Sequence, residues 1–292
     1  MINRWWSRRW TSPDRRKTGE ATVGVQRQYM GCAGRIANGV NTAYCCYATP
    51  GGHAMVGARI YVPADQLADP DRRAACGVGA EVSFRTKPQL ALDICRDMVD
   101  DATMPPWVAG DEVYGRSGAL RTFLEDNQIG YVMRVGRAFH VALMPGLGSA
   151  RAEQMVTRYV GTDAWQVCSV TGSKGERAYA WAWIATTSPH HFLLIRKHLR
   201  TGELAYHYCH LPAGRSATLM TLVRVACLRW PVEERLCATR RSAVFPAQPG
   251  GTWREVSGSD GLPGAERLRG QEHARKPATG LRRPGRCAGG PA

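Results

Sequence analysis

The chain has 292 residues, 44% of them hydrophobic, which is enough to bury one large core or two modest ones. Its 39 Lys and Arg residues exceed its 24 Asp and Glu residues, and the net charge of +15 favours a polyanionic partner. None of the ten cysteines stands in a Cys-x-x-Cys pair, no secretory signal is present and no apolar stretch reaches membrane-spanning length. These features predict a reduced cytosolic protein and argue against a membrane protein.

Residues 1–20 show neither helical nor strand periodicity and predict an irregular basic arm. The apolar runs 40–48 and 54–62, separated by a tight turn, predict two paired strands. A loop rich in Asp and Arg follows, and 82–84 is expected to form a third short strand. A helix is then predicted from Pro88, because Pro suits a first helical position and apolar residues follow at intervals of four.

The stretch 107–115 carries the clearest chemical signal. Its apolar start predicts a strand that ends at Asp111, and Gly115 opens a turn into a helix with Ser117 as N-cap and Gly130 as C-cap. Another apolar run, 131–135, follows. An acid at the carboxyl end of a strand faces a cleft, which suits a metal or substrate ligand. The alternative is an ordinary solvated Asp in a strand–helix turn.

The remainder of the chain changes from strands to a helix and then to a polar tail. Strands are predicted at 165–170, 178–185, 192–196 and 204–209, a helix from Ser216, and a restart of that helix at Pro231. Beyond 242 the chain is mostly Gly, Pro and Arg, which predicts disorder. The predicted segments are an arm (1–20), the first part of a catalytic domain (21–136), a β-rich insertion (137–215), a helix (216–241) and a disordered tail (242–292).

Five segments resemble insertion-sequence transposases of the DDE superfamily, in the DDE endonuclease branch. They are Val23-Gly-Val-Gln-Arg-Gln-Tyr29, Gly34-Arg-Ile-Ala-Asn38, Thr86-Lys-Pro88, Gly110-Asp-Glu-Val-Tyr-Gly115 and Arg229-Trp-Pro-Val-Glu-Glu234. The resemblance runs from about residue 17 to 241, with the motifs in the family's order. It implies an α/β fold of the RNase H-like kind: a mixed sheet with flanking helices and a β-rich insertion.

The resemblance also implies DNA cleavage at transposon ends and strand transfer, with two Mg²⁺ (or Mn²⁺) ions held by three carboxylates. Asp111 corresponds to the second acid. Glu233 is our choice for the third, because Arg229 lies four residues before it as in the related signature, and Glu234 is its rival. Without the resemblance, a salt-bridged, solvated helix start is the favoured interpretation of both acids. The Lys that ends the signature falls on Arg240.

The first acid has no counterpart. Its position falls near Thr11, and residues 1–16 supply neither an apolar strand nor a suitable carboxylate, since Asp14 follows Pro13 in an expected surface turn. A missing first strand would leave sheet edges unpaired. Both ends of the chain are therefore expected to reflect truncations or reading-frame shifts, and the protein to be a remnant.

Double-stranded DNA is the partner that the resemblance implies, with self-association in a synaptic complex and a bacterial, nucleoid-associated location. Basic residues are the expected contacts to DNA: Lys174, Arg196, Lys197, Arg229 and Arg240. The alternatives to a transposase are a non-catalytic DNA-binding fragment and a poorly folded translation product.

Two further groups admit a functional and a structural interpretation. Trp181 and Trp183 would share one strand face, where core packing is favoured over the role in base flipping that the resemblance to transposases implies. His207 and Cys209 would share a face that His210 does not, so a structural role is favoured over zinc binding. His190 and His191 are expected in a solvated turn.

Overall fold

The structure is a computed structural model that describes residues 3–10, 22–30, 35–49, 52–143, 148–172, 175–187, 190–215 and 218–227. Side chains are described in these ranges except at 3–10, 28–30, 52–53, 170–172 and 175–177. All described residues lie in one unit, Met1–Ala247.

The described residues form twelve strands and seven α-helices. The strands are β1 (Asn3–Trp10), β2 (Val25–Met30), β3 (Arg35–Thr49), β4 (Gly52–Tyr61), β5 (Trp107–Gly110), β6 (Gly130–Val135), β7 (His140–Ala142), β8 (Ser149–Arg151), β9 (Gln166–Gly172), β10 (Gly175–Ala185), β11 (His191–His198) and β12 (Leu204–His210). The helices are α1 (Ala64–Ala68), α2 (Pro70–Ala75), α3 (Lys87–Asp100), α4 (Glu112–Gly115), α5 (Gly118–Asp126), α6 (Ala152–Tyr159) and α7 (Leu219–Cys227), with a short 3₁₀ helix at Thr162–Ala164.

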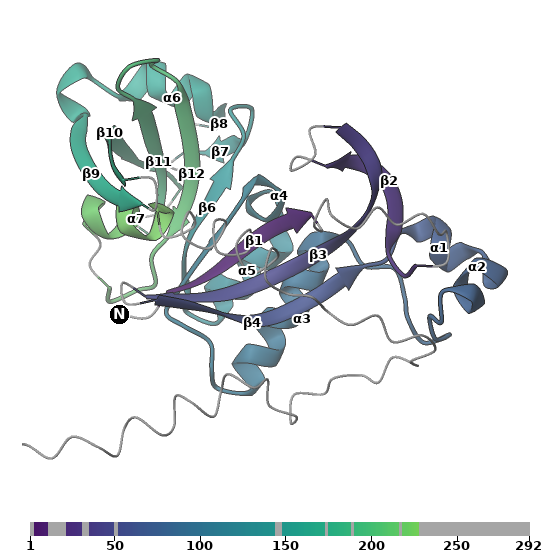
Figure 1. The fold of residues 1–292 in the computed structure, drawn as a ribbon. Helices are drawn as coiled ribbons and strands as arrows, with labels where there is room; N and C mark the ends of the chain where they lie inside the picture. Colours follow the sequence, from purple (N-terminus) through teal and green to yellow (C-terminus); the bar gives the residue numbers. More distant parts are fainter. Residues whose placement is uncertain are drawn as a thin grey trace, which may run out of the picture. The chain divides into compact units, whose positions relative to one another are not determined.

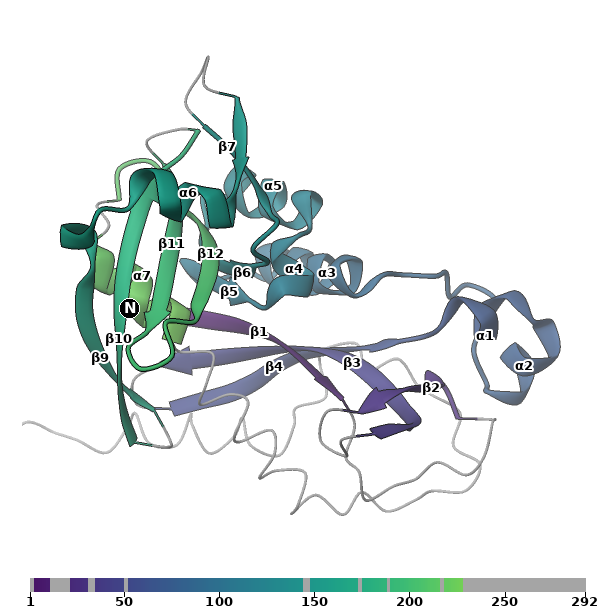
Figure 2. The ribbon, with the colours of Figure 1, turned by 90° about the horizontal axis from the view of Figure 1, so that it is seen from above.

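A mixed sheet organises the fold. Its strands follow the order β4, β3, β1, β5, β6, with β1 antiparallel to β3 and parallel to β5, and β5 parallel to β6. Figure 2 shows β1 between β3 and β5. Three antiparallel strands followed by two parallel ones, with helices packed on the sheet, confirm the predicted mixed α/β class.

The prediction of an irregular arm over residues 1–20 is wrong for β1. This strand pairs Trp5 with Cys46 of β3 and with Ala109 of β5, so neighbours on both sides satisfy its backbone. The adjacent Arg8 and Arg9 break the alternation by which a strand is recognised, although tryptophan favours strands. The strand that seemed to be missing is thus present in the centre of the sheet.

Three smaller expectations also differ from the structure. Residues 82–84 form no strand, and the loop after β4 contains the short helices α1 and α2. Gly130 is the first residue of β6, since α5 ends at Asp126 and Gln128 takes the left-handed conformation (φ 55°) that closes the helix. By contrast, Ser117 caps α5 as predicted, and α3 begins one residue before the predicted Pro88, after a capping box at Thr86.

Helices cover both faces of the central strands. On one face, α3 and α5 pack Ile94, Met98 and Leu120 against Val108 and Tyr131. The opposite face is covered by α7, whose apolar residues pack with alternate residues of the same strands. These are Trp107, Ala109 and Val132, together with Trp181, Leu194 and Cys209 of the following strands.

The strands β9 to β12 form an antiparallel meander near the predicted positions. It extends the central sheet, because β12 pairs with β6 from Tyr206 opposite Val135 to His210 opposite Tyr131. The second face of the meander packs against β7, β8 and α6. Figure 1 shows the meander at one end of the sheet and β2 at the other.

The strand β3 is longer than its neighbours. Its residues 41–49 pair with β4, and residues 35–40 pair with β2. Gln66, buried in α1, fixes the start of β2: its Oε1 accepts from the Gly24 amide at 2.9 Å, and its Nε2 donates to the Val25 carbonyl at 2.9 Å and to that of Thr22 at 3.3 Å. These bonds replace the backbone partners that an edge strand lacks.

Candidate functional site

Asp111 lies where the sequence predicts it, immediately after β5. Its backbone is extended and its side chain is the N-cap of α4, with Oδ1 accepting a hydrogen bond from the Val113 amide at 2.8 Å. The side chain is half-buried. The geometry therefore presents a carboxylate at the carboxyl end of a buried strand, one oxygen of which is held by the start of a helix.

The close approach of α4 to β6 depends on Gly115. A Cβ atom at this position would lie 2.0 Å from the carbonyl oxygen of Arg134. The Gly115 carbonyl in turn accepts a hydrogen bond from the guanidinium of Arg121 on α5. Since α4 is only one turn long, these contacts also fix the residue that precedes it, Asp111.

Asp111 shares its side of the sheet with two arginines. Ala109 of β5, Val132 of β6 and Leu194 of β11 all pack under α7. Two residues further along the chain from each of them come Asp111, Arg134 and Arg196 respectively. Because side chains alternate along a strand, all three project from the face that α7 covers. Arg134 is on β6 directly after Met133, the partner of Gly110, and thus borders Asp111.

The other neighbour of Asp111 is β1, which carries no acid. In the parallel ladder Trp5 is opposite Ala109, so Ser7 is level with Asp111. The sequence of β1, NRWWSRRW, contains neither Asp nor Glu. Asp111 is thus bordered by a serine position on one strand and an arginine on the other.

Positive charge gathers at this end of the sheet. Burial lowers the pKa of Arg196, and the charge of Arg134 lowers it further. The nearby Tyr179 acts in the opposite direction and raises this pKa. The guanidinium of Arg196 lies 4.6 Å from the centre of the Tyr179 ring. Lys197 is exposed, 5.4 Å from the Trp165 ring. Two neighbouring guanidiniums, one of them partly desolvated, favour an anion such as a phosphate.

The remaining predicted site residues are only partly reached by the structure. Glu233, Glu234, Arg229, Arg240, Lys174, Thr11 and Asp14 lie outside the described residues. The described part of α7 ends at Cys227. Burial raises the pKa of the Cys227 thiol to about 12, and the charge of Arg196 opposes this rise. The convergence of Glu233 with Asp111 stays a prediction.

A second polar cluster joins α5 to the meander. Glu125 accepts hydrogen bonds from the Tyr131 hydroxyl at 2.6 Å and pairs with His191 Nε2 at 3.2 Å, and the His191 ring lies 4.8 Å from that of His210. The predicted solvated turn is wrong for His191, which lies in β11 and is mostly buried. The cluster is at the amino end of β6, whereas Asp111 follows the carboxyl end of the neighbouring parallel strand.

We expect this cluster to make stability depend on pH. Burial tends to raise the pKa of Glu125, but hydrogen bonds from Tyr131 and His191 and the charge of the histidines hold it below 4.5. Burial and the charge of His191 lower the pKa of His210 below 6.5. Both groups therefore contribute stability that is complete above about pH 7 and is lost on acidification, first as the unfolded His210 takes up a proton and then as Glu125 does.

Urea unfolding at a series of pH values measures this effect. His210→Phe should flatten the dependence just below pH 6.5, and Glu125→Gln should flatten it below pH 4.5. A wild-type curve that is already flat over this range would contradict the assignment.

The histidines and Cys209 of β12 show no metal site. Cys209 is buried under α7, and His210 is on the opposite face beside Tyr131 and His191. Within the described ranges, no group of three or more His, Cys, Asp or Glu side chains is arranged to hold a metal ion. The structural interpretation of these residues agrees with their burial.

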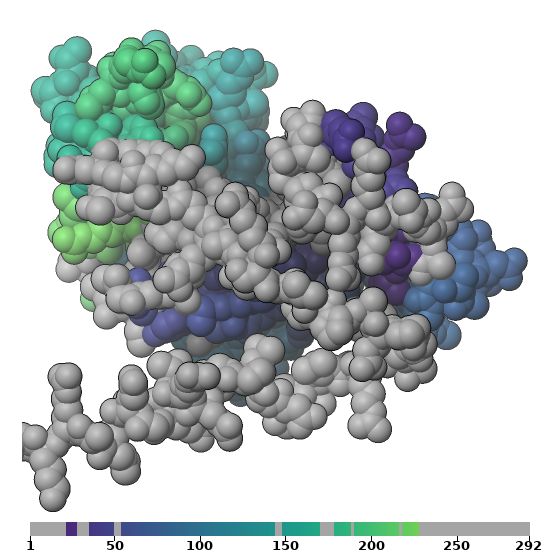
Figure 3. Space-filling model, viewed as in Figure 1, coloured from purple at the N-terminus to yellow at the C-terminus, as the bar shows by residue number. Residues whose placement is uncertain are grey.

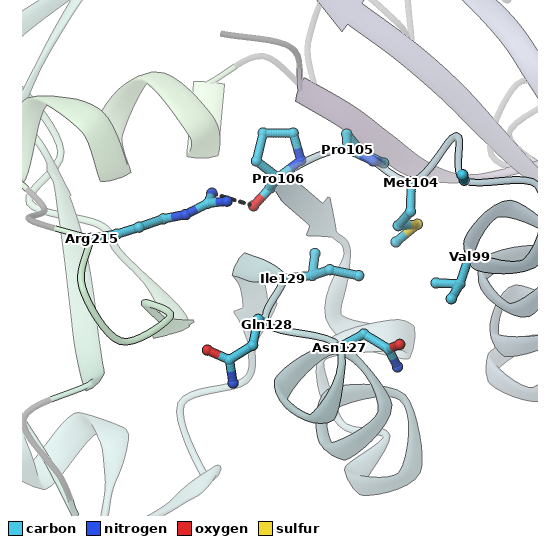
Figure 4. Close-up of a pocket in the computed structure, with 9 residues that line it drawn as sticks. Val99, Met104, Pro105, Pro106, Asn127, Gln128, Ile129 and Arg215 are labelled. Atoms are coloured by element: carbon cyan, nitrogen blue, oxygen red, sulfur yellow. Dashed lines mark hydrogen bonds between the residues drawn. The ribbon is translucent and has the colours of Figure 1, made fainter.

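A shallow pocket of about 410 Å³ lies at the amino end of β5 and β6 (Figure 4). Val99, Met104 and Ile129 line it, and Arg215 borders it while donating to the Pro106 carbonyl at 3.3 Å. Pro106 directly precedes β5, whereas Asp111 follows it. The pocket is therefore not part of the Asp111 site.

None of the described helices is long and apolar enough to cross a bilayer.

Comparison with known proteins identifies the family. No curated protein matches the chain. The sequence profile described as DDE superfamily endonuclease matches residues 11–174, more than half of the chain. The match includes Asp111 and ends before α7. This protein therefore belongs to the DDE superfamily of endonucleases.

Proposed function

We propose that this protein is a transposase-derived nuclease scaffold that binds double-stranded DNA and whose catalysis is impaired. Family membership supports a transposase-like nuclease function. The parent reaction would be cleavage at transposon ends followed by attack of the freed 3′-hydroxyl on target DNA. Insertion-sequence origin, synaptic self-association and residence at the nucleoid are further parts of this proposal.

The observation that carries the proposal is the acid-free central strand β1. Carboxylates would hold a pair of Mg²⁺ ions in this site, and the chemistry that the ions would supply is neutralisation of the negative charge that develops in an in-line displacement. Asp111 fits such a cation, since it offers a hard oxygen at the end of a strand. The neighbouring strand β1 fits a pair of cations poorly, because Ser7 stands level with Asp111, where a further carboxylate would be needed.

We further propose that Glu233 would be the third acid. Support comes from the path of α7, which begins after Arg215 near Pro106 and reaches the side of Arg196 at Cys227. This path leads from the amino end of β5 towards the end that bears Asp111. Binding of the DNA backbone is assigned to Arg134, Arg196 and Lys197, with Lys174, Arg229 and Arg240 added from the sequence.

The test of impaired catalysis is nicking of supercoiled plasmid in Mg²⁺ or Mn²⁺. We expect the wild type to nick no faster than Asp111→Asn, because Asp111 and the proposed Glu233 cannot hold the metal pair without an acid on β1. Ser7→Asp should introduce metal-dependent nicking that Ser7→Asp combined with Asp111→Asn loses. Asp126→Asn, a change of an exposed acid on α5, is the control. A wild-type rate well above that of Asp111→Asn would overturn impairment.

A non-catalytic DNA-binding fragment is the second candidate, favoured by Arg134 and Arg196, which are close enough for the charge of Arg134 to lower the pKa of Arg196. Phosphate contacts release counterions, so the affinity for duplex DNA should fall steeply with salt. A response that does not change with salt would contradict DNA binding.

A further inference from the structure

The outer part of β3 and its partner β2 form a two-stranded ribbon, which we call the β2–β3 ribbon (residues 25–30 and 35–40). The ladders of β3 with β1 and β4 both begin at Asn41, so residues 35–40 have only β2 beside them among the described strands. In the space-filling view, β2 and the first residues of β3 reach the surface (Figure 3).

The ribbon continues from the edge of the sheet that bears Asp111. Ser7 of β1 is level with Asp111 and pairs with Tyr44 of β3. Following β3 backwards from Tyr44 leads past the carboxyl end of β5 and into the ribbon, where Asn38 pairs with Arg27. Six residues separate Tyr44 from Asn38, which corresponds to about 20 Å along the strand.

The same face of the sheet continues into the ribbon. Cys46 packs with Ala109 in the core under α7, on the face from which Asp111 projects. Asn38 is eight residues before Cys46 in β3. Because side chains alternate along a strand, Asn38 lies on the same face as Cys46. Arg27, opposite Asn38, shares that side, and both side chains are exposed.

The charge of this region selects a polyanion. No Asp or Glu occurs between residues 21 and 64, which include Arg27, Arg35 and Arg59. Arg59 is engaged by Asp97 of α3, whereas Arg27 and Arg35 are exposed on the ribbon. The charge that the ribbon offers to a partner is therefore wholly positive.

Shape and side-chain chemistry narrow the partner to duplex DNA. The major groove is about 12 Å wide and admits a two-stranded β-ribbon. Arginine forms bidentate hydrogen bonds with guanine and asparagine with adenine, and both types are opposite each other in the pair Arg27 and Asn38.

We propose that the β2–β3 ribbon enters the major groove of DNA held at the Asp111 edge, where Arg27 and Asn38 contact bases. At about 3.4 Å per base pair, a separation of about 20 Å places this contact about six base pairs from the phosphate nearest Asp111. The inference rests on the proposed function in taking DNA as the ligand, but it does not require cleavage.

The test is duplex binding by fluorescence anisotropy together with selection of bound sequences from a randomised duplex library. The proteins are the wild type, Arg27→Ala, Asn38→Ala and, as a matched control, Arg158→Ala, which removes an exposed arginine at the end of α6. We expect Arg27→Ala to weaken binding to the selected sequence about tenfold, and Asn38→Ala to abolish the preference at one position. Arg158→Ala should change neither.

The outcomes separate this inference from the proposed function. A wild type that fails to bind duplex DNA would overturn both. Binding by the wild type with Arg27→Ala and Asn38→Ala equal to Arg158→Ala would overturn the ribbon contact alone. Equal weakening of all sequences by Arg27→Ala, with no selected position, would overturn groove reading, since it would indicate a phosphate contact. Circular dichroism of each variant confirms that the fold is retained.

Discussion

Replacing Gly115 with alanine should lower the free energy of unfolding by about 3 kcal/mol, because the added methyl group would overlap a backbone atom. The new Cβ would lie 2.0 Å from the Arg134 carbonyl oxygen and 3.3 Å from Met133 Cβ. A flexible side chain could move away, but the carbonyl is in the β6 backbone between the ladders to β5 and β12. Relief would require α4 to shift, and with it Asp111.

Gly118→Ala is the matched control. It changes the same residue type three positions later, at the start of α5, where a Cβ would meet nothing within 4 Å. Alanine favours a helix over glycine, so this variant should be neutral or more stable by up to about 1 kcal/mol. Urea unfolding followed by circular dichroism compares the two. Equal changes in both variants would contradict the close approach of α4 to β6.

Trp181→Ala should destabilise the protein by about 3–5 kcal/mol, the usual cost of removing a large buried aromatic residue. Trp181 is 1% exposed in the core under α7, with Tyr179 and His207 beside its ring at centroid distances of 6.5 Å and 6.1 Å. The predicted core packing is thus confirmed for Trp181, and its burial leaves no surface on which a base could stack.

Trp183→Ala provides the comparison within the same strand. Trp183 is only partly buried and stacks on Phe192 at 4.9 Å, so its loss should cost clearly less than that of Trp181. Guanidinium unfolding measures both variants, and duplex binding by Trp181→Phe is the second readout. Loss of binding in a stable Trp181→Phe protein would favour a direct role on DNA over a role in the core.

The elements predicted well from the sequence are those whose signals are local. Pro88 marks the start of α3 to within one residue, and the strands of the meander follow runs bounded by turns. The strand β1 depends on partners far along the chain, at Cys46 and Ala109, so no window around its own residues indicates it.

The candidate site likewise contains residues that a local sequence pattern predicts and residues that only the folded chain brings together. Asp111 was found because its strand, its carboxylate and its helix are consecutive. The contact between Glu125 and His191 spans 66 residues, and nothing near either residue announces the other. Of the two arginines on this face, the sequence indicates only Arg196, since Arg134 resembles an ordinary strand residue until the ladder places it one residue beyond Met133, the partner of Gly110.

The ladder between β12 and β6 makes the meander a continuation of the central sheet and not a separate module. Excising it would remove the β12 partners of Tyr131–Val135 and leave β6, the strand beside Asp111, as an unpaired edge. A meander transferred to another protein would likewise leave β12 without its partner β6. An insertion or deletion that shifts the register of β12 would therefore also disturb β6, the strand beside Asp111.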